Sequence, residues 1–123
     1  MSLEFARLAA EAAVAKTLEE TLILDVSELI GITEYFVVTA GRNERQVRSI
    51  VDEINLRCRN AGLGRPRQVE GLHDGKWVLV DYGSFVVHIF DAESREYYSI
   101  ERLWSDAERM PISFEMSIAA NDR

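Results

Sequence analysis

The chain has 123 residues, 47% of them apolar, which fits one compact domain with its own hydrophobic core. Its net charge of −7 argues against direct RNA or DNA binding, and against sequence-specific nucleic-acid binding in particular, as the main activity, because nucleic-acid readers usually carry the opposite charge. The single cysteine, Cys58, excludes an intramolecular disulfide and a cysteine-based zinc site. Without a membrane-length apolar run or a basic, signal-like start, the chain is expected to be cytoplasmic and free of the membrane.

The first part of the chain shows one helix pattern and two strand patterns. Apolar residues at three- and four-residue spacing predict a helix over residues 2–15. Nearly unbroken apolar runs predict strands over 21–26 and 35–39, of the kind that is buried on both faces. Residues 27–33 are predicted to connect these two strands.

The clearest helix signal lies between Asn43 and Gly62. Asn43 suits the N-cap position, and Gln46 three residues later completes a capping-box pattern. Gly62 is predicted to end the helix as its C′ residue. One apolar stripe should face the core, formed by Val47, Ile50, Val51, Ile54, Cys58 and Ala61.

Three further strands are predicted over 67–70, 76–82 and 85–90. Asp74-Gly75 is a strong signal for a two-residue hairpin turn, and Gly83-Ser84 fits a type II′ turn with glycine first. These turns would place the three strands side by side as two successive hairpins.

A last helix is predicted over 94–106, with Tyr97, Ile100 and Trp104 on one side, and the pattern fades from Arg109 onward. The predicted order is α-β-β-α-β-β-β-α, an α/β (α+β) domain with a mixed five-stranded sheet flanked by helices. Residues 1–108 are expected to form this domain and 109–123 a flexible C-terminal tail.

The alternation of side chains along the second hairpin separates two faces of the sheet. One face should be core, because all six residues are apolar or aromatic: Tyr82 opposite Phe85, Val80 opposite Val87, and Val78 opposite Ile89. The other face is mixed, pairing Asp81 with Val86, Leu79 with His88, and Trp77 with Phe90. An Asp74-Gly75 turn would add Glu70 to this face, opposite Leu79.

Two readings of the mixed face remain open. The last helix could cover it wholly or in part, as the layered packing of sheets favours. An uncovered remainder, apolar with a polar rim and containing a tryptophan, would be typical of a surface that binds a partner or a second copy of the chain.

Motifs of enzymes and metal sites are weak or missing. His73 lies beside a turn and His88 on a strand, without the spacing of a zinc-binding pair, and no phosphate-binding glycine loop is present. Gly83-Ser84 followed by Asp91-Ala92-Glu93 faintly matches the nucleotidyltransferase pattern, in which two acids after a Gly-Ser turn hold Mg²⁺. A metal-dependent nucleotidyltransferase is therefore kept as an alternative, beside a dimeric adaptor.

A series of short motifs runs in order along residues 3–106. They are Leu24-Asp25-Val26, Ile32-Thr33-Glu34-Tyr35-Phe36-Val37, Gly41, Arg45-Gln46-Val47, Glu70-Gly71, Asp74 through Gly83, Val86-Val87-His88-Ile89-Phe90, Arg95-Glu96-Tyr97-Tyr98 and Leu103-Trp104. In number and order they resemble the Iojap or RsfS family of ribosome-silencing factors.

The resemblance implies a function without covalent chemistry or cofactors. Such proteins bind large-ribosomal-subunit protein fourteen on the 50S subunit and block joining of the small subunit, which lowers translation. The family fold is nucleotidyltransferase-like, and members can form homodimers. Carried over by position, the family's binding strip falls on Trp77, Asp81 and Tyr82, with His88 beside them. Sorting by face instead favours Glu70, Trp77, Leu79, Asp81 and His88 and places Tyr82 toward the core.

Overall fold

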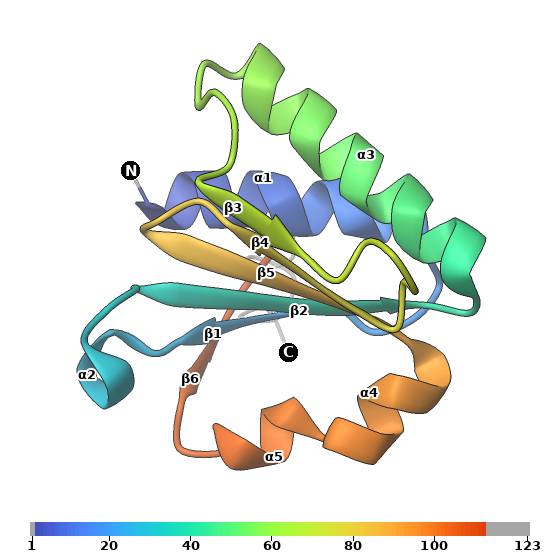
Figure 1. Ribbon diagram of the computed structural model, residues 1–123. Helices are drawn as coiled ribbons and strands as arrows, with labels where there is room; N and C mark the ends of the chain where they lie inside the picture. Colours follow the sequence, from blue (N-terminus) through green and yellow to red (C-terminus); the bar gives the residue numbers. More distant parts are fainter. Residues whose placement is uncertain (1, 113–123) are drawn as a thin grey trace, which may run out of the picture.

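The computed structural model describes residues 2–112, which form a six-stranded mixed sheet with helices on both faces (Figure 1). The strands are β1 (Leu22–Asp25), β2 (Tyr35–Gly41), β3 (Gln68–Glu70), β4 (Trp77–Asp81), β5 (Phe85–Asp91) and β6 (Glu108–Met110). The helices are α1 (Ser2–Val14), α2 (Ser27–Ile30), α3 (Glu44–Asn60), α4 (Ala92–Tyr98) and α5 (Ile100–Leu103). Within the described residues, none of these helices is long and apolar enough to cross a membrane.

The sheet is built around one parallel pair of strands. Its order is β3-β4-β5-β2-β1-β6; β2 and β5 run parallel, and every other pair is antiparallel. Parallel neighbours need a long crossover connection. Here that connection contains α3, β3 and β4. The strands β3 and β4 therefore lie on the β5 side of the β2–β5 pair.

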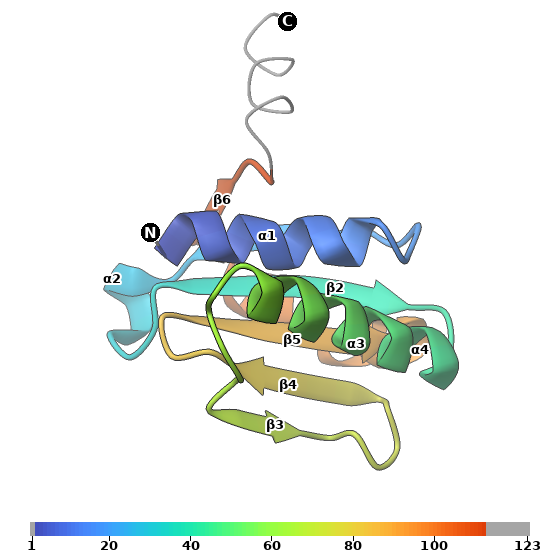
Figure 2. The same ribbon diagram turned by 90° about the horizontal axis from the view of Figure 1, so that it is seen from above.

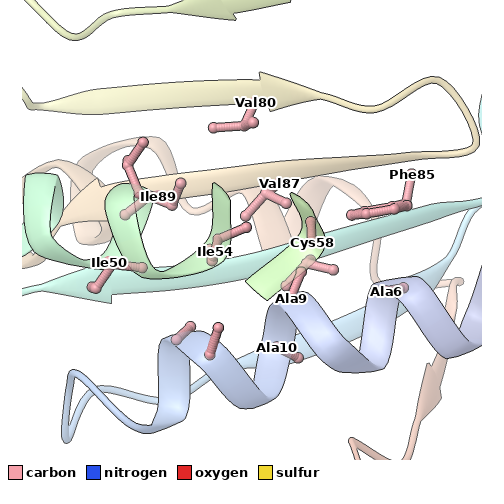
Figure 3. Close-up of a cluster of buried hydrophobic side chains, with 14 of the residues drawn as sticks. Ala6, Ala9, Ala10, Ile50, Ile54, Cys58, Val80, Phe85, Val87 and Ile89 are labelled. Carbon is pink, nitrogen blue, oxygen red and sulfur yellow. The ribbon is translucent and has the colours of Figure 1, made fainter. Parts of the chain in front are cut away.

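One face of the sheet is covered by α1 and α3, which lie side by side across it (Figure 2). Alanines at five positions let α1 approach closely, and the apolar stripe of α3 packs above β2 and β5 (Figure 3). The face sorting is confirmed: Val78, Val80, Tyr82, Phe85, Val87 and Ile89 all belong to this core.

The other face is covered by α4 and α5, which lie beneath β2 and β1 in Figure 1. A second, smaller core forms there from Leu22, Leu24, Val26, Phe36, Val38, Ala40, Phe90, Ile100 and Ala107. The last helical segment therefore covers part of this face, and the outer part of β4 and β3 stays uncovered.

The ends of α3 lie where the sequence predicts, but the capping box is only half formed, because the Gln46 side-chain oxygen accepts from the Arg42 N–H instead of the Asn43 N–H. The Asn43 side chain accepts a hydrogen bond of 2.9 Å from the Gln46 amide N–H. At the other end Gly62 has φ of 89°, its N–H donates to the Arg59 carbonyl, and the Leu63 N–H donates to the Cys58 carbonyl. This is a Schellman motif, which satisfies carbonyl groups that the last helical turn leaves unpaired.

The prediction of five strands is wrong, and so is the predicted tail where it covers residues 109–112. Residues 108–110 form β6, which pairs antiparallel with β1, and Ile112 is buried in the main core. Arg7 of α1 also donates a hydrogen bond to the Pro111 carbonyl. A strand of three mostly exposed residues is too short to show alternation in the sequence. It forms because its backbone pairs with the edge of β1. Residues 113–123 of the predicted tail lie outside the described residues.

The single last helix predicted over 94–106 is also wrong. It is broken at Ser99, which has a left-handed φ of 46° and ends α4 before α5 begins. The break turns Tyr97 outward, where it is 81% exposed, while Ile100 is buried.

In the predicted connection 27–33, residues Ser27–Ile30 form α2, whose first residue is held by the Asp25 carboxylate.

The connection between β3 and β4 is a six-residue loop rather than the predicted two-residue turn. Glu70 nevertheless pairs with Leu79, the register that a turn at Asp74-Gly75 would set. The Arg48 guanidinium of α3 donates a hydrogen bond to the Leu72 carbonyl and so holds the loop against that helix. Gly71 begins the loop with φ of 89°, and a Cβ there would lie 2.0 Å from the Trp77 carbonyl oxygen.

We expect Gly71→Ala to lower the free energy of unfolding by more than about 2 kcal/mol, since a left-handed non-glycine residue alone costs about 1 kcal/mol or more and the clash adds to it. Gly64→Ala is the matched control, because Gly64 has φ of 86° but no atom within 4 Å of an added Cβ. Urea denaturation of both variants measures the difference. Equal losses would contradict the close approach of Gly71 to β4.

Candidate functional site

The uncovered part of the sheet carries the mixed residues predicted from the sequence. We call it the β4 surface and define it as Glu70, Trp77, Leu79, Asp81 and Val86. Glu70 is exposed, and the other four are half-buried. The strand register places Glu70 beside Leu79, and Asp81 beside Val86. The β4 surface therefore combines apolar groups with two carboxylates, next to the edge strand of the sheet.

Trp77 is held in place from several sides. Its ring stacks on Phe90 with 5.0 Å between ring centroids, and Tyr98 of α4 packs against it at 4.8 Å. The indole Nε1–H donates a hydrogen bond of 3.1 Å to His88 Nδ1. Tryptophan usually needs such a partner when it is partly buried. Trp77 is thus half-buried at the surface, with its orientation fixed by these contacts.

His88 supports this tryptophan from inside the protein. It is 4% exposed, and Phe36 packs edge-on against its ring at 4.6 Å. Burial lowers the pKa of His88 to about 4, so the imidazole is neutral near pH 7. Because Nδ1 accepts the bond from Trp77, the proton of the neutral ring lies on Nε2, which has no hydrogen-bond partner among residues 2–112. His88 is too buried to touch a partner directly.

The two carboxylates of the β4 surface are oriented by local hydrogen bonds. Asp81 Oδ1 accepts a bond of 2.7 Å from the Gly83 N–H, which fixes the side chain at the start of the β4–β5 turn. Glu70 Oε1 accepts a bond of 2.6 Å from the Gln68 side-chain amide. None of the ion pairs within residues 2–112 involves either residue. Both are available for a basic partner.

Tyr82 does not join the β4 surface. It lies on the opposite face of the sheet, 9% exposed, where its ring stacks on Phe85 and its hydroxyl donates to Asn55 of α3 at 2.6 Å. Burial raises its pKa above the ordinary value. The strand alternation explains this placement, because neighbours along a strand point to opposite faces. Carrying the family strip over by position had grouped Tyr82 with Asp81, and the structure separates them.

Sequence reasoning missed the contribution of the helical segment beside the β4 surface. Tyr98 is 47% exposed and Leu103 76% exposed, while Trp104 packs edge-on against Phe36. The break at Ser99 determines which of these side chains face outward. A serine in a left-handed conformation has no clear sequence signal, so their exposure could not be read from helical periodicity.

The faint nucleotidyltransferase pattern is not assembled in space. Gly83-Ser84 forms the turn before β5, and Asp91 lies at the far end of the same strand. A strand rises about 3.4 Å per residue, which separates the two points by roughly 20 Å. The Asp91 carboxylate instead caps α4, accepting a bond of 2.7 Å from the Ser94 N–H. In the part of the chain that the structure describes, no three His, Cys, Asp or Glu side chains are grouped to hold a metal ion.

The family model described as "Ribosomal silencing factor during starvation" (RsfS) matches residues 1–123. The chain belongs to the RsfS family. It is 35% identical to the ribosomal silencing factor RsfS of Bacillus subtilis over 90% of this chain and 93% of that protein. It is also 31% identical to a mouse protein named "Mitochondrial assembly of ribosomal large subunit protein 1", over 68% of this chain and 37% of that protein.

Two crystal structures share this RsfS-family fold. One, from Chromobacterium violaceum, superimposes with a TM-score of 0.78 and 34% identity, covering 83% of this chain and 84% of that one. The other, from Bacillus halodurans, has a TM-score of 0.75 and 30% identity, covering 88% of this chain and 97% of that one. The mixed α+β architecture is therefore confirmed for nearly the whole described chain.

The buried His88 makes stability depend on pH. Its folded-state pKa, about 4, lies below the unfolded value of 6.5. The unfolded chain therefore binds a proton first as the pH falls, and stability is lost between pH 6.5 and pH 4. By linkage this amounts to about 3 kcal/mol at most.

We expect His88→Asn to remove this part of the pH dependence, because its side-chain oxygen can still accept from Trp77 but does not titrate. Urea denaturation at pH 7 and pH 4.5 measures how far the free energy of unfolding falls in the wild type and in His88→Asn. Both proteins share the loss due to their carboxylates, so the difference between them is due to His88. His73→Asn is the control, as His73 is exposed. A His88→Asn protein as sensitive to pH as the wild type would refute the prediction.

Proposed function

We propose that this chain binds large-ribosomal-subunit protein fourteen through the β4 surface and blocks joining of the small subunit. The observation that carries the proposal is the β4 surface itself, an uncovered apolar and acidic area around a tryptophan whose orientation is fixed. Membership of a family described as silencing ribosomes supports it. The name of the mouse relative supports the large subunit as the target.

Two kinds of interaction would hold the partner. Trp77 and Leu79 would supply buried apolar area, the usual source of affinity at the centre of an interface. Asp81 and Glu70 would pair with lysine or arginine residues of a basic ribosomal protein, which speeds encounter and fixes the register of docking. The net charge of −7 adds a general attraction toward a basic partner.

Silencing then needs no catalytic step. A domain of this size, seated where the small subunit must dock, excludes it by volume alone. His88 would contribute indirectly by holding the Trp77 ring, so that little side-chain entropy is lost on binding. A cytoplasmic location belongs to this proposal, because the partner is part of a ribosome.

We expect Trp77→Ala to weaken binding to purified large subunits about 30-fold, since a tryptophan anchor is worth about 2 kcal/mol or more. Leu79→Ala should weaken it about fivefold, by roughly 1 kcal/mol of lost apolar contact. The measurements are cosedimentation with large subunits and the amount of joined ribosome formed on adding small subunits. Both variants should lose inhibition of joining in step with binding.

Leu56→Ala is the matched control, because Leu56 is an exposed leucine on α3, on the other face of the sheet. It should bind and inhibit like the wild type. Thermal unfolding establishes that each variant is folded. Wild-type protein that saturates large subunits without reducing joining would refute the blocking mechanism. Equal binding by the Trp77, Leu79 and control variants would refute the β4 surface as the binding site.

A further inference from the structure

Basic residues are not spread evenly over this acidic chain. Residues 54–69 contain four arginines and no aspartate or glutamate, whereas the other residues carry 10 lysines and arginines against 21 acidic residues. The segment comprises the C-terminal half of α3, the loop that follows, and the start of β3. Its local charge is therefore opposite to that of the molecule as a whole.

Three of the four arginines are free to bind a ligand. Arg57 pairs with Glu53 at 2.6 Å on α3. Arg59, Arg65 and Arg67, which we call the arginine cluster, are exposed, and none has an acidic partner within 4.0 Å among residues 2–112. Arg59 also suits the negative end of the α3 dipole. Arg65 and Arg67 lie beyond the helix, where the dipole gives them no such role.

The backbone that carries the arginine cluster is anchored at both ends. The Schellman motif at Gly62 fixes the end of α3, and the Leu63 side chain packs against the main core. At the other end the Arg67 N–H donates a bond of 2.7 Å to the Asp81 carbonyl. Arg59 is thus presented by the last turn of α3, and Arg65 and Arg67 by a short loop that is tied at both ends, so that binding orders little backbone.

One member of the arginine cluster, Arg67, is next to the β4 surface along the edge of the sheet. Arg67 is bonded through its backbone to Asp81, and its side chain lies beside Gly83, 3.3 Å from where a Cβ on that glycine would be. In Figure 1 the loop from α3 runs down to β3, the edge strand next to β4. Because Gln68 pairs with Asp81, strand alternation puts the Arg67 side chain on the opposite face of the sheet, so a partner on the β4 surface meets the arginine cluster where it extends around the β3 edge.

We propose that the arginine cluster binds phosphate groups of ribosomal RNA beside the protein on which the β4 surface docks. This inference rests on the proposed function, which places the chain on a ribosome. Guanidinium groups match phosphate oxygens with two parallel hydrogen bonds, and all three residues are arginine rather than lysine. Phosphate contacts carry no sequence information, so the inference agrees with the absence of a nucleic-acid reading motif.

The test is the salt dependence of binding to purified large subunits. Each phosphate contact adds about 0.7 to 0.9 to the slope of log affinity against log salt concentration. Replacing Arg59, Arg65 and Arg67 together by glutamine should lower that slope by about 2 to 3. Between about 50 and 200 mM salt, the wild type should lose roughly 20- to 40-fold more affinity than this cluster variant.

A control variant removes the same charge elsewhere. Arg42→Gln, Arg45→Gln and Arg109→Gln alter exposed arginines at the start of α3 and on β6, away from the arginine cluster. Its slope should equal that of the wild type. A cluster variant whose slope matches the control would overturn the inference. A photo-crosslinking amino acid at position 65 should attach to ribosomal RNA, and attachment to protein alone would also overturn it.

Wild-type protein that fails to bind large subunits would refute the proposed function rather than the arginine cluster. A gel shift with a short RNA duplex at low salt then tests whether the arginine cluster binds RNA outside a ribosome. Binding by the wild type and the control variant, but not by the cluster variant, would support RNA contact outside a ribosome. Absence of binding by all three would overturn the inference as well.

Discussion

Burial of the two central strands on both faces is the constraint on which the rest of the structure depends. β2 and β5 are almost wholly buried, so both sides of the sheet need a helical layer. α1 and α3 supply a full layer on one side. On the other, α4 and α5 have seven and four residues, enough to cover β1, β2 and the end of β5. β4, one strand further out, is left open there, and the β4 surface follows from this shortage of helix.

Trp77 and His88 occupy the boundary between the covered and uncovered parts of that face. A buried imidazole that stays neutral gives up part of its hydration, and His88 Nε2 finds no partner within residues 2–112. In exchange, the indole N–H at the boundary is satisfied, and its ring is fixed between Phe90 and Tyr98. This arrangement makes sense for a surface anchor, because a fixed tryptophan loses less entropy on binding than a mobile one.

Strand alternation predicted the two faces of the sheet correctly, residue by residue, since a period of two is unambiguous once the turn at Gly83-Ser84 sets the register. It also placed Tyr82 in the core, where position within a family motif had misled. What it could not show was the extent of helix cover. That depends on Ser99, a single left-handed residue that splits the last helix, and on β6, which is stabilised by backbone pairing with β1 instead of by its own side chains. Burial of His88 likewise depends on how the Phe36 and Trp77 rings pack against it, which alternation does not show.

Net charge is an incomplete guide to the partners of this molecule. A total of −7 suits a basic protein partner, yet the acid-free segment beside β3 has the opposite character. The Arg67 N–H donates to the Asp81 carbonyl, so the two regions meet at one edge of the sheet. Under the proposed function the target is a basic ribosomal protein surrounded by phosphate, which presents both charges at close range. Two rigidly linked contacts, each modest alone, reinforce each other there because binding of the first makes the second intramolecular. The two proposed contacts together therefore favour docking on an assembled subunit over a free ribosomal protein or naked RNA.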